Sequence, residues 1–344
     1  MHQKENFPLV HYRGYELVVL EGHDHMKYRI GIDLGGTKVG IGVVDEHANL
    51  LFQSEIPTRV SKDEELSPRD LAKRILDATN ELCSLHQINA QELESIGVGV
   101  PGTVDTANGI IVYANNLDFV QVPFVSYLED YFHVPVRMDN DANVAAWAEY
   151  KAGQGKDKAL ESFVMMTLGT GVGAGFVFHD RLFAGCNQGA GEIGHMVIDI
   201  HGKPCNCGRR GCFENYASAT ALIEAAQDAM EAHPESILWS LCADKNNMNG
   251  KLFFEAIRQK DETAQAVLNQ YMTYLSVGVL NIINSLQPDM LVIGGGISKA
   301  GELILTPLCE QVEKLVYTKD DNIQTQIVMA KLGNEAGILG AALL

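Results

Sequence analysis

The chain has 344 residues, a formal net charge of −18, 46% hydrophobic and 20% charged residues, and seven cysteines. The length suits two globular domains, and the negative charge opposes binding to nucleic acid or to anionic membrane surfaces. No apolar run approaches the roughly 18 residues of a membrane span, and an odd number of cysteines, three of them clustered beside a histidine, argues for a reducing, cytoplasmic location.

Residues 1–25 have no clear period, so we expect them to be an N-terminal extension, native or added, outside the fold. Three β-rich runs separated by turn residues then predict a meander, and Ser67-Pro68 predicts the start of a helix. An apolar stripe along that helix continues at helical spacing. The predicted strands of this half are Tyr28–Asp33, Val39–Val44, Leu50–Ile56 and Ile96–Val100, and the helical stripe consists of Leu71, Ile75, Leu82 and Leu85.

The second half repeats the pattern of a strand, a Gly-Thr turn and a strand, which predicts an internal duplication. Mainly helical sequence follows, and a last helix would return to the first domain and join the two domains. The predicted strands are Val134–Met138, Phe163–Leu168, Met290–Ile293 and Gln326–Met329, and the predicted helices are Ala142–Lys151, Ser218–Glu231, Glu262–Ser285, Leu303–Val316 and Gly337–Leu344.

Two glycine turns are candidates for phosphate binding. In the first, Gly35 and Gly36 let backbone N–H groups approach a phosphate, while Thr37 and Lys38 add a hydroxyl and a cation. Thr170 and Gly171 repeat this chemistry, so the two turns could hold a triphosphate while Asp33 orients a magnesium ion. Glycine turns between strands are also common without any ligand. Neither a Walker loop nor a Rossmann fingerprint occurs.

The run Asp139-Asn140-Asp141 stands where a predicted strand gives way to a helix, a position that exposes a carboxylate at the edge of a sheet. Asp141 could accept the proton of an attacking hydroxyl. Alternatively, Asp139 or Asp141 could simply cap the helix. Asp105, after a Pro-Gly turn, is expected to cap a turn rather than to place a ligand.

The segment 192–214 contains a candidate metal site, with one histidine, three cysteines and two glutamates. His195, Cys205, Cys207 and Cys212 have a spacing that could close a tetrahedral zinc site, because soft thiolates select zinc over magnesium or calcium. His201 is an alternative ligand, and reduced core cysteines are the alternative to any metal. The remaining cysteines considered, Cys83, Cys242 and Cys309, are expected to be small core hydrophobes.

Taken together, these motifs resemble the ROK family of sugar kinases and repressors over residues 26–344. The motifs are Asp33–Lys38, Gly99-Val100-Pro101-Gly102, Asn140–Asn143, Gly169–Gly171, Gly191–His195 and Cys205–Glu214. The resemblance implies an α/β, actin-like (ribonuclease H-like) fold of two domains with a central cleft. A small domain, 26–141, would be completed by a C-terminal helix at about 330–344, and the large domain, 142–329, would carry the zinc motif.

The resemblance also implies residue roles. Asp141 matches the catalytic base, and the sugar would be bound by Asn115, Asn140, Asp141, Glu192, His195 and Glu214. His195 would act twice, with one ring nitrogen on zinc and the other facing the sugar. Zinc would be held by His195, Cys205, Cys207 and Cys212, and ATP by Asp33, Gly35, Gly36, Thr37, Lys38, Thr170, Gly171, Gly295 and Gly296.

The implied activity is phosphorylation of a hexose by Mg-ATP, with glucose converted to glucose 6-phosphate in a homodimer or homotetramer. The alternatives are an N-acetylmannosamine or N-acetylglucosamine kinase, and a non-catalytic sugar-sensing regulator. A repressor needs a DNA-binding module ahead of Asp33, and the residues there lack a helix-turn-helix pattern. Asp118-Phe119 stands where many family glucokinases carry Gly-Trp, which puts glucose itself in doubt.

Overall fold

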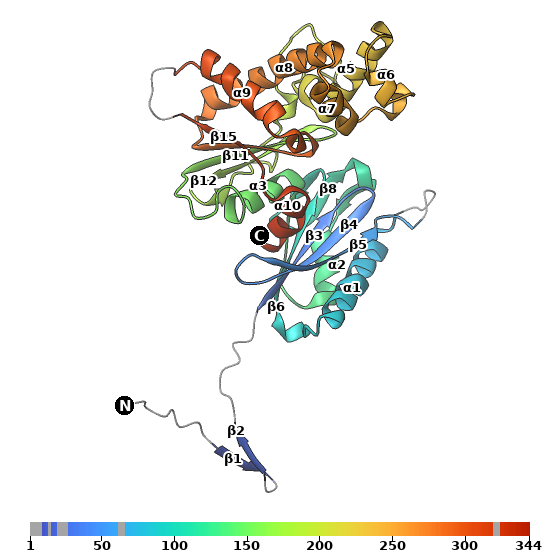
Figure 1. Cartoon of the computed structure of the whole chain (residues 1–344). Helices are drawn as coiled ribbons and strands as arrows, with labels where there is room; N and C mark the ends of the chain where they lie inside the picture. Colours follow the sequence, from blue (N-terminus) through green and yellow to red (C-terminus); the bar gives the residue numbers. More distant parts are fainter. Residues whose placement is uncertain (1–8, 13–14, 19–26, 61–65, 319–323) are drawn as a thin grey trace.

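The computed structural model describes residues 9–12, 15–18, 27–60, 66–318 and 324–344. Most of the expected N-terminal extension therefore lies outside the described residues. Within it, β1 (Leu9–Tyr12) and β2 (Tyr15–Val18) pair antiparallel as a hairpin. The rest of the described chain forms two α/β bodies, which we call the small and the large domain, one below the other in the view of Figure 1.

The small domain is built on a five-stranded sheet in the order β10-β6-β3-β4-β5. Its antiparallel meander is continued by two parallel strands, because β6 runs parallel to β3 and β10 runs parallel to β6. Helix α1 (Pro68–Leu85) buries Leu71, Ile75 and Leu82 in this domain's core, and Ser67 caps it by accepting a hydrogen bond from the Asp70 N–H at 3.3 Å. The strands are β3 (Tyr28–Leu34), β4 (Lys38–Val44), β5 (Leu50–Pro57), β6 (Leu93–Val100) and β10 (Val136–Asn140).

A second, three-stranded antiparallel sheet extends the small domain between β6 and β10. It contains β7 (Thr103–Asp105), β8 (Ile110–Ala114) and β9 (Phe119–Val122), and helix α2 (Phe124–Phe132) follows it. The sequence pattern did not predict these elements. The strands are short, and polar turns interrupt their apolar alternation.

The large domain repeats the small domain's topology in the order β13-β12-β11-β14-β15. Here too an antiparallel meander is continued by two parallel strands, so the predicted duplication exists at the level of topology. The strands are β11 (Ser162–Leu168), β12 (Val172–Phe178), β13 (Arg181–Leu182), β14 (Met290–Gly294) and β15 (Gln326–Met329). In register, Asp33 of β3 corresponds to Thr167 of β11, since they pair with Gly40 and Gly173 respectively.

Most helices of the large domain lie above its sheet in Figure 1. They are α4 (Glu214–Ala217), α5 (Ala219–Ala232), α6 (Leu238–Leu241), α7 (Gly250–Arg258), α8 (Glu262–Leu286) and α9 (Glu302–Leu315). Helix α8 is long and apolar enough to cross a membrane by composition alone, contrary to the expectation that no run approaches a span. Its apolar residues are instead buried in the core of this domain, where they pack against α5 and α9.

Two helices cross between the domains. Helix α3 (Asp141–Lys151) follows β10 of the small domain but packs on β11 and β12 of the large one. Helix α10 (Ala336–Ala342) follows β15 of the large domain but packs on β3 and β6 of the small one, and the two helices contact each other. Glycines permit this approach, since a Cβ at Gly31 would lie 1.8 Å from the Ile338 carbonyl oxygen and one at Gly97 1.7 Å from that of Ala341.

Two details of the predicted elements are wrong. Strand β10 begins at Val136 rather than Val134 and continues to Asn140, because its register with β6 pairs Asn140 with Val100. The side chain at Leu85, expected in the buried stripe of α1, is 73% exposed because it stands at the last position of the helix, beyond the core contacts.

Candidate functional site

The cleft between the domains holds two cavities that share Asp141, Ala142, Thr167 and Gly295. The first, of about 440 Å³, contains three carboxylates and is called the carboxylate cavity. The second, of about 820 Å³, is lined by the first Gly-Thr turn and is called the turn cavity. Asp141 therefore stands where a ligand in one cavity meets a ligand in the other.

The local structure at the start of α3 separates a capping residue from a free carboxylate. Asn140 is the N-cap, and its Oδ1 accepts hydrogen bonds from the N–H groups of Ala142 at 2.9 Å and Asn143 at 3.4 Å. Asp139 is buried and accepts from Asn143 Nδ2 at 2.8 Å. Because Asn140 caps the helix, the Asp141 carboxylate at the first helical position is left to face the cleft.

Burial in the cleft raises the pKa of Asp141 to about 6. The side chain is open to solvent in the cavity, yet protein surrounds it on several sides and removes much of the bulk water that would stabilise its charge. The negative charge of Asp33 adds to the upward shift. Burial also raises the pKa of Asp33, while the Lys38 ammonium opposes that rise. Two desolvated carboxylates therefore share one end of the turn cavity.

The first Gly-Thr turn forms a wall of the turn cavity through Asp33, Gly35, Thr37 and Lys38. It is closed by a hydrogen bond from the Gly35 N–H to the Lys38 carbonyl oxygen at 3.0 Å. Lys38 makes an ion pair with Glu55, which raises the pKa of the lysine, mainly through their hydrogen bond. Gly36 does not line the cavity, because it packs against Asn116 of the neighbouring loop.

The second Gly-Thr turn lines the carboxylate cavity with Thr170 and Gly171. Glu214 anchors this turn, since its Oε2 accepts a hydrogen bond from the Val172 N–H at 2.9 Å. Gly295 lines both cavities at a φ of 78°, and a Cβ there would lie 2.5 Å from the Leu168 carbonyl oxygen. Gly296 lies instead beside a third cavity.

Of the residues expected to bind sugar, Asn140, Asp141, Glu192 and Glu214 line the carboxylate cavity. Asn115 does not, and its Oδ1 accepts a hydrogen bond from the Tyr113 hydroxyl at 3.0 Å. The neighbouring Asn116 takes the place in the lining. His195 also stands behind the lining, with Nε2 4.0 Å from Glu192 Oε2.

The ligand atoms of His195, Cys205, Cys207 and Cys212 all lie within 4.8 Å of one another. His195 Nδ1 is 3.8 Å from Cys205 Sγ, and the sulfurs of Cys207 and Cys212 are 3.6 Å apart. With Zn–S bonds of about 2.3 Å, two sulfurs of a tetrahedral site lie about 3.8 Å apart, so the donor set and spacing fit zinc. His201 does not belong to this cluster.

The thiols of the cluster differ in acidity, since burial and the neighbouring Cys207 raise the pKa of Cys212. Hydrogen bonds from the Arg209 backbone and side chain lower the pKa of Cys207 to about 6. A thiolate is the form of cysteine that binds metal.

Asp105 caps its turn as expected, because its Oδ1 accepts a hydrogen bond from the Asn108 N–H at 3.1 Å.

Sequence reasoning missed two parts of the site. Thr167, which lines both cavities, had no motif of its own, although its match to Asp33 in the duplicated topology identifies it.

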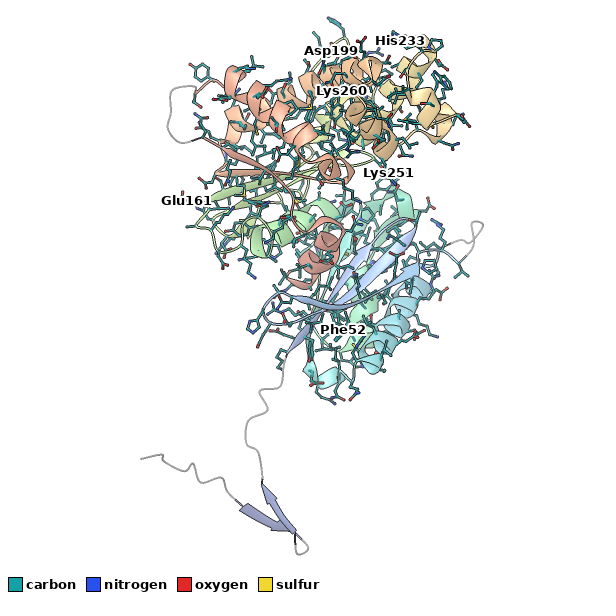
Figure 2. All side chains as sticks on the ribbon, viewed as in Figure 1. Phe52, Glu161, Asp199, His233, Lys251 and Lys260 are labelled. Atoms are coloured by element: carbon teal, nitrogen blue, oxygen red, sulfur yellow. The ribbon has the colours of Figure 1, made fainter. Side chains whose placement is uncertain are left out.

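The third cavity, of about 490 Å³, has apolar walls and several cations, and we call it the apolar cavity. It is lined by Leu222, Ile223, Phe254, Ile297, Lys251, Arg258 and Lys299, which are scattered over α5, α7 and the turn after β14. Lys251 lies on the side of the large domain that faces the small one (Figure 2).

Comparison with known proteins identifies relatives over nearly the whole chain. The model of the ROK family matches residues 29–344. A glucokinase from Halalkalibacterium halodurans is 36% identical over 321 residues, which cover 92% of this chain and 94% of that protein. The crystal structure of a ROK family glucokinase from Streptomyces griseus, in complex with glucose and AMPPNP, superposes with a TM-score of 0.76 at 31% identity, covering 92% of this chain and 98% of that one.

Relatives with other activities are also similar. An N-acetylmannosamine kinase from Escherichia coli is 30% identical over 92% of this chain and 97% of its own length. A xylose repressor from Caldicellulosiruptor bescii is 27% identical over 95% of this chain and 80% of its own length. The similarity thus covers sugar kinases and sugar-responsive regulators.

Proposed function

The chain belongs to the ROK family and has its actin-like two-domain fold, and from the geometry of the cleft we propose that it is an ATP-dependent hexose kinase acting on glucose. The observation that carries the proposal is the position of Asp141, whose carboxylate stands where the carboxylate cavity meets the turn cavity. A group transferred between ligands in the two cavities would pass beside it.

The hexose occupies the carboxylate cavity in this proposal, where Asn140, Glu192 and Glu214 bind its hydroxyl groups. Asp141 accepts the proton of the 6-hydroxyl as that oxygen attacks the terminal phosphorus of ATP. The bond between this phosphorus and the bridging oxygen breaks, ADP leaves, and glucose 6-phosphate forms. A carboxylate with a pKa of about 6 is largely ionised at neutral pH and still basic enough to take the proton.

ATP spans the rest of the cleft. Gly35, Thr37 and Lys38 contact its phosphates in the turn cavity, and the apolar cavity beside Gly296 receives the nucleoside. Its apolar walls suit a base, and its cations suit the adjoining phosphates. Asp33 would hold Mg²⁺, which neutralises phosphate charge when bound. The raised pKa of Asp33 supports this assignment, because a bound cation would stabilise the charge of a desolvated carboxylate.

Zinc is held by His195, Cys205, Cys207 and Cys212 in this proposal, and it supplies rigidity rather than chemistry. With Nδ1 directed at the cluster, the His195 ring is fixed so that Nε2 faces Glu192. Glu192 in turn lines the carboxylate cavity. The metal site thus orients a sugar ligand through one intervening side chain.

The geometry of Asp118 and Phe119 removes the argument against glucose that their sequence raised. Phe119 is 2% exposed and belongs to the core of the small domain, and neither residue lines the carboxylate cavity. Asp118 forms an ion pair with Arg59 at 2.7 Å and has a φ of 58°, a conformation that glycine adopts readily. The replacement of Gly-Trp by Asp-Phe is therefore accommodated away from the cavity.

The test is a coupled assay of ADP formation over glucose, mannose, fructose, allose and the N-acetyl hexosamines. We expect the highest kcat/KM with glucose. Asp141→Asn is the matched control, because it keeps the shape of the side chain and removes the base, and it should lower kcat about 10²- to 10⁴-fold. Absence of sugar-dependent ADP formation with every sugar would contradict the kinase proposal.

The alternative substrates are N-acetylmannosamine and N-acetylglucosamine, favoured by the similarity to the Escherichia coli kinase. A higher kcat/KM with either of them than with glucose would replace glucose in the proposal. A non-catalytic regulator is the other alternative, and it would bind sugar without forming ADP.

We also propose a cytoplasmic location, because the thiol ligands stay reduced there. We further propose assembly as a homodimer or homotetramer, and light scattering would test this.

A further inference from the structure

The carboxylate cavity is bounded by both domains. Gly102 and Thr103 line it from the small domain, and Gln188, Glu192 and Glu214 from the large one. A hydrogen bond from the Thr106 hydroxyl to Gln188 Oε1, at 3.1 Å, joins these two sides. Thr106 follows β7, and Gln188 lies in the loop after β13, so the bond links segments 82 positions apart.

The Thr106–Gln188 bond also separates two cavities. Gln188 lines the carboxylate cavity, whereas Thr106 lines a cavity of about 360 Å³ beside Arg137, Asp139 and Leu344. Both side chains are half-buried. The pair therefore forms part of the wall around the carboxylate cavity and fixes the direction of the Gln188 amide.

The charged side chains that line the carboxylate cavity are all carboxylates, and its side-chain amides are those of Asn116, Asn140 and Gln188. Asp141, Glu192 and Glu214 are acceptors when ionised. Asn140 caps α3 with its Oδ1 and donates one Nδ2 hydrogen to the Gly102 carbonyl oxygen at 2.9 Å, which leaves one hydrogen for a sugar hydroxyl. Hydroxyl groups of a hexose that donate to carboxylates still need donors for their lone pairs. Gln188 Nε2 has no hydrogen-bond partner among the residues that the structure describes, so it is available as such a donor.

The backbone at Gln188 provides a second observation. Its φ is 61°, a left-handed conformation that disfavours side chains other than those of glycine, asparagine and aspartate. The conformation is not peculiar to Gln188, since Gln87, Gln121 and Gln287 adopt it too. The reach of the Gln188 side chain, by contrast, is what allows contact with Thr106 of the other domain.

We propose that Gln188 binds a hexose hydroxyl through Nε2 and that Thr106 is the positioning residue that holds this amide in place from the opposite domain. The inference rests on the proposed function, since it assigns a further ligand of the same hexose. It also makes one sugar contact depend on the two domains being correctly placed.

The experiment measures glucose binding by calorimetry without nucleotide, in parallel with KM values for glucose and ATP. Thr106→Val removes the hydroxyl at constant shape and should weaken glucose binding about three- to tenfold with the KM for ATP unchanged. Thr106→Ser keeps the hydroxyl and should restore wild-type affinity. Gln188→Asn suits the left-handed backbone but is too short to reach Thr106, so it should lose affinity without loss of thermal stability. Cys186→Ser, on the same loop, is the control and should bind as wild type does.

Monodeoxy glucose analogues test direct contact. In the wild type, removal of the hydroxyl bound by Gln188 weakens binding, whereas Gln188→Ala should bind that analogue and glucose about equally. Equal glucose affinity of Thr106→Val and the wild type would overturn the role of Thr106. If Gln188→Ala discriminates among all analogues as the wild type does, no contact with Gln188 exists. A wild-type protein that binds no hexose would overturn the proposed function itself, and with it this inference.

Discussion

At the residue scale, the start of α3 separates two tasks that a single acidic residue often combines. Asn140 satisfies the helix N-terminus, so the Asp141 carboxylate does not need to cap and can face both cavities. Asp141 keeps one local hydrogen bond, from the Ala142 N–H at 2.8 Å, which restrains its rotamer. Burial then sets its pKa close to neutrality. Position and basicity thus have separate structural causes.

The raised pKa of Asp141 predicts the acid limb of the pH–rate profile. A base must be ionised, so kcat/KM should fall about tenfold per pH unit below pH 6 and become constant above about pH 7. Burial stabilises the protonated form of Asp141. Between pH 3.8 and 6 the folded state therefore keeps a proton that the unfolded state has lost, and the free energy of unfolding falls as the pH rises through this window. Above pH 6 the ionised carboxylate destabilises the fold by its full amount.

Two measurements check this assignment. The first is kcat/KM for glucose from pH 5 to 8, with the coupling enzymes in excess. The second is the melting temperature of Asp141→Asn at pH 7.5, which should be equal to or above that of the wild type despite the lost activity. An acid limb centred near pH 4, or a clearly destabilised variant, would contradict the cause given for the shift.

The sequence predicted site residues unevenly, for physical reasons. Glycine turns and a Cys/His cluster have fixed spacings, so Gly35, Thr170 and the four candidate zinc ligands could be identified before their positions were known. Gln188, Thr167 and Asn116 have no such spacing, since each reaches the cavities only through the packing of distant segments. Asn115 and Asn116 are neighbours in the short helical turn Asn115–Leu117, and their side chains point in different directions. Motif spacing does not tell which of the two faces the carboxylate cavity.

At the scale of elements, the predicted strands were nearly correct where a strand is buried on both faces. Strands β3, β11 and β14 are mostly apolar and buried and lead into glycine turns, although β3 contains Arg29 and Asp33, and this pattern leaves little freedom in register. Strands β7 to β9 were missed because their hairpins carry polar turns such as Asp105–Asn108. The segment between η3 (Ile193–His195) and α4 is likewise irregular, with a few backbone bridges such as Val197 to Cys212.

Glu192 and Glu214 flank η3 and this irregular segment, so we expect the metal site between them to control sugar binding. Cys207→Ser removes an exposed ligand and should lower zinc content and weaken glucose binding about tenfold or more, with the KM for ATP unchanged. Zinc per chain is measured by elemental analysis and affinity by calorimetry. Cys186→Ser lies outside the cluster and should retain zinc. Loss of zinc at unchanged glucose affinity would contradict the proposed coupling.

At the scale of the whole molecule, one buried carboxylate joins the two crossing helices. Glu149 of α3 is fully buried, and its Oε1 accepts from the N–H groups of Lys331 at 2.7 Å and Leu332 at 2.6 Å. Its Oε2 accepts from the Gln154 N–H at 3.0 Å. Lys331 and Leu332 lead from β15 to α10, and Gly333 and Asn334 after them line the turn cavity. Glu149 thereby fixes one wall of the turn cavity relative to the helix that carries Asp141.

Glu149→Gln tests this connection at nearly constant volume. The substitution places an amide donor against backbone donors, so it should lower the free energy of unfolding by about 2 to 4 kcal/mol. Denaturant unfolding measures the change, and a fall in the melting temperature should accompany it. Glu224→Gln, an exposed residue on α5, should change stability by less than about 0.5 kcal/mol. Equal stability of Glu149→Gln and the wild type would contradict the role of this carboxylate.

The exchange of helices between the domains also constrains how the chain is made. During synthesis, β3, β4 and β6 leave the ribosome well before α10, the helix that covers one face of their sheet, because α10 begins 236 positions after the end of β6 (336 − 100). The apolar face of the small domain's sheet therefore stays exposed until Ala336–Ala342 is synthesised and packs on it. The Leu344 carbonyl oxygen then accepts a hydrogen bond from Arg137 of β10. A segment made after the whole large domain thus completes the sheet of the small domain, whose strands were made before it.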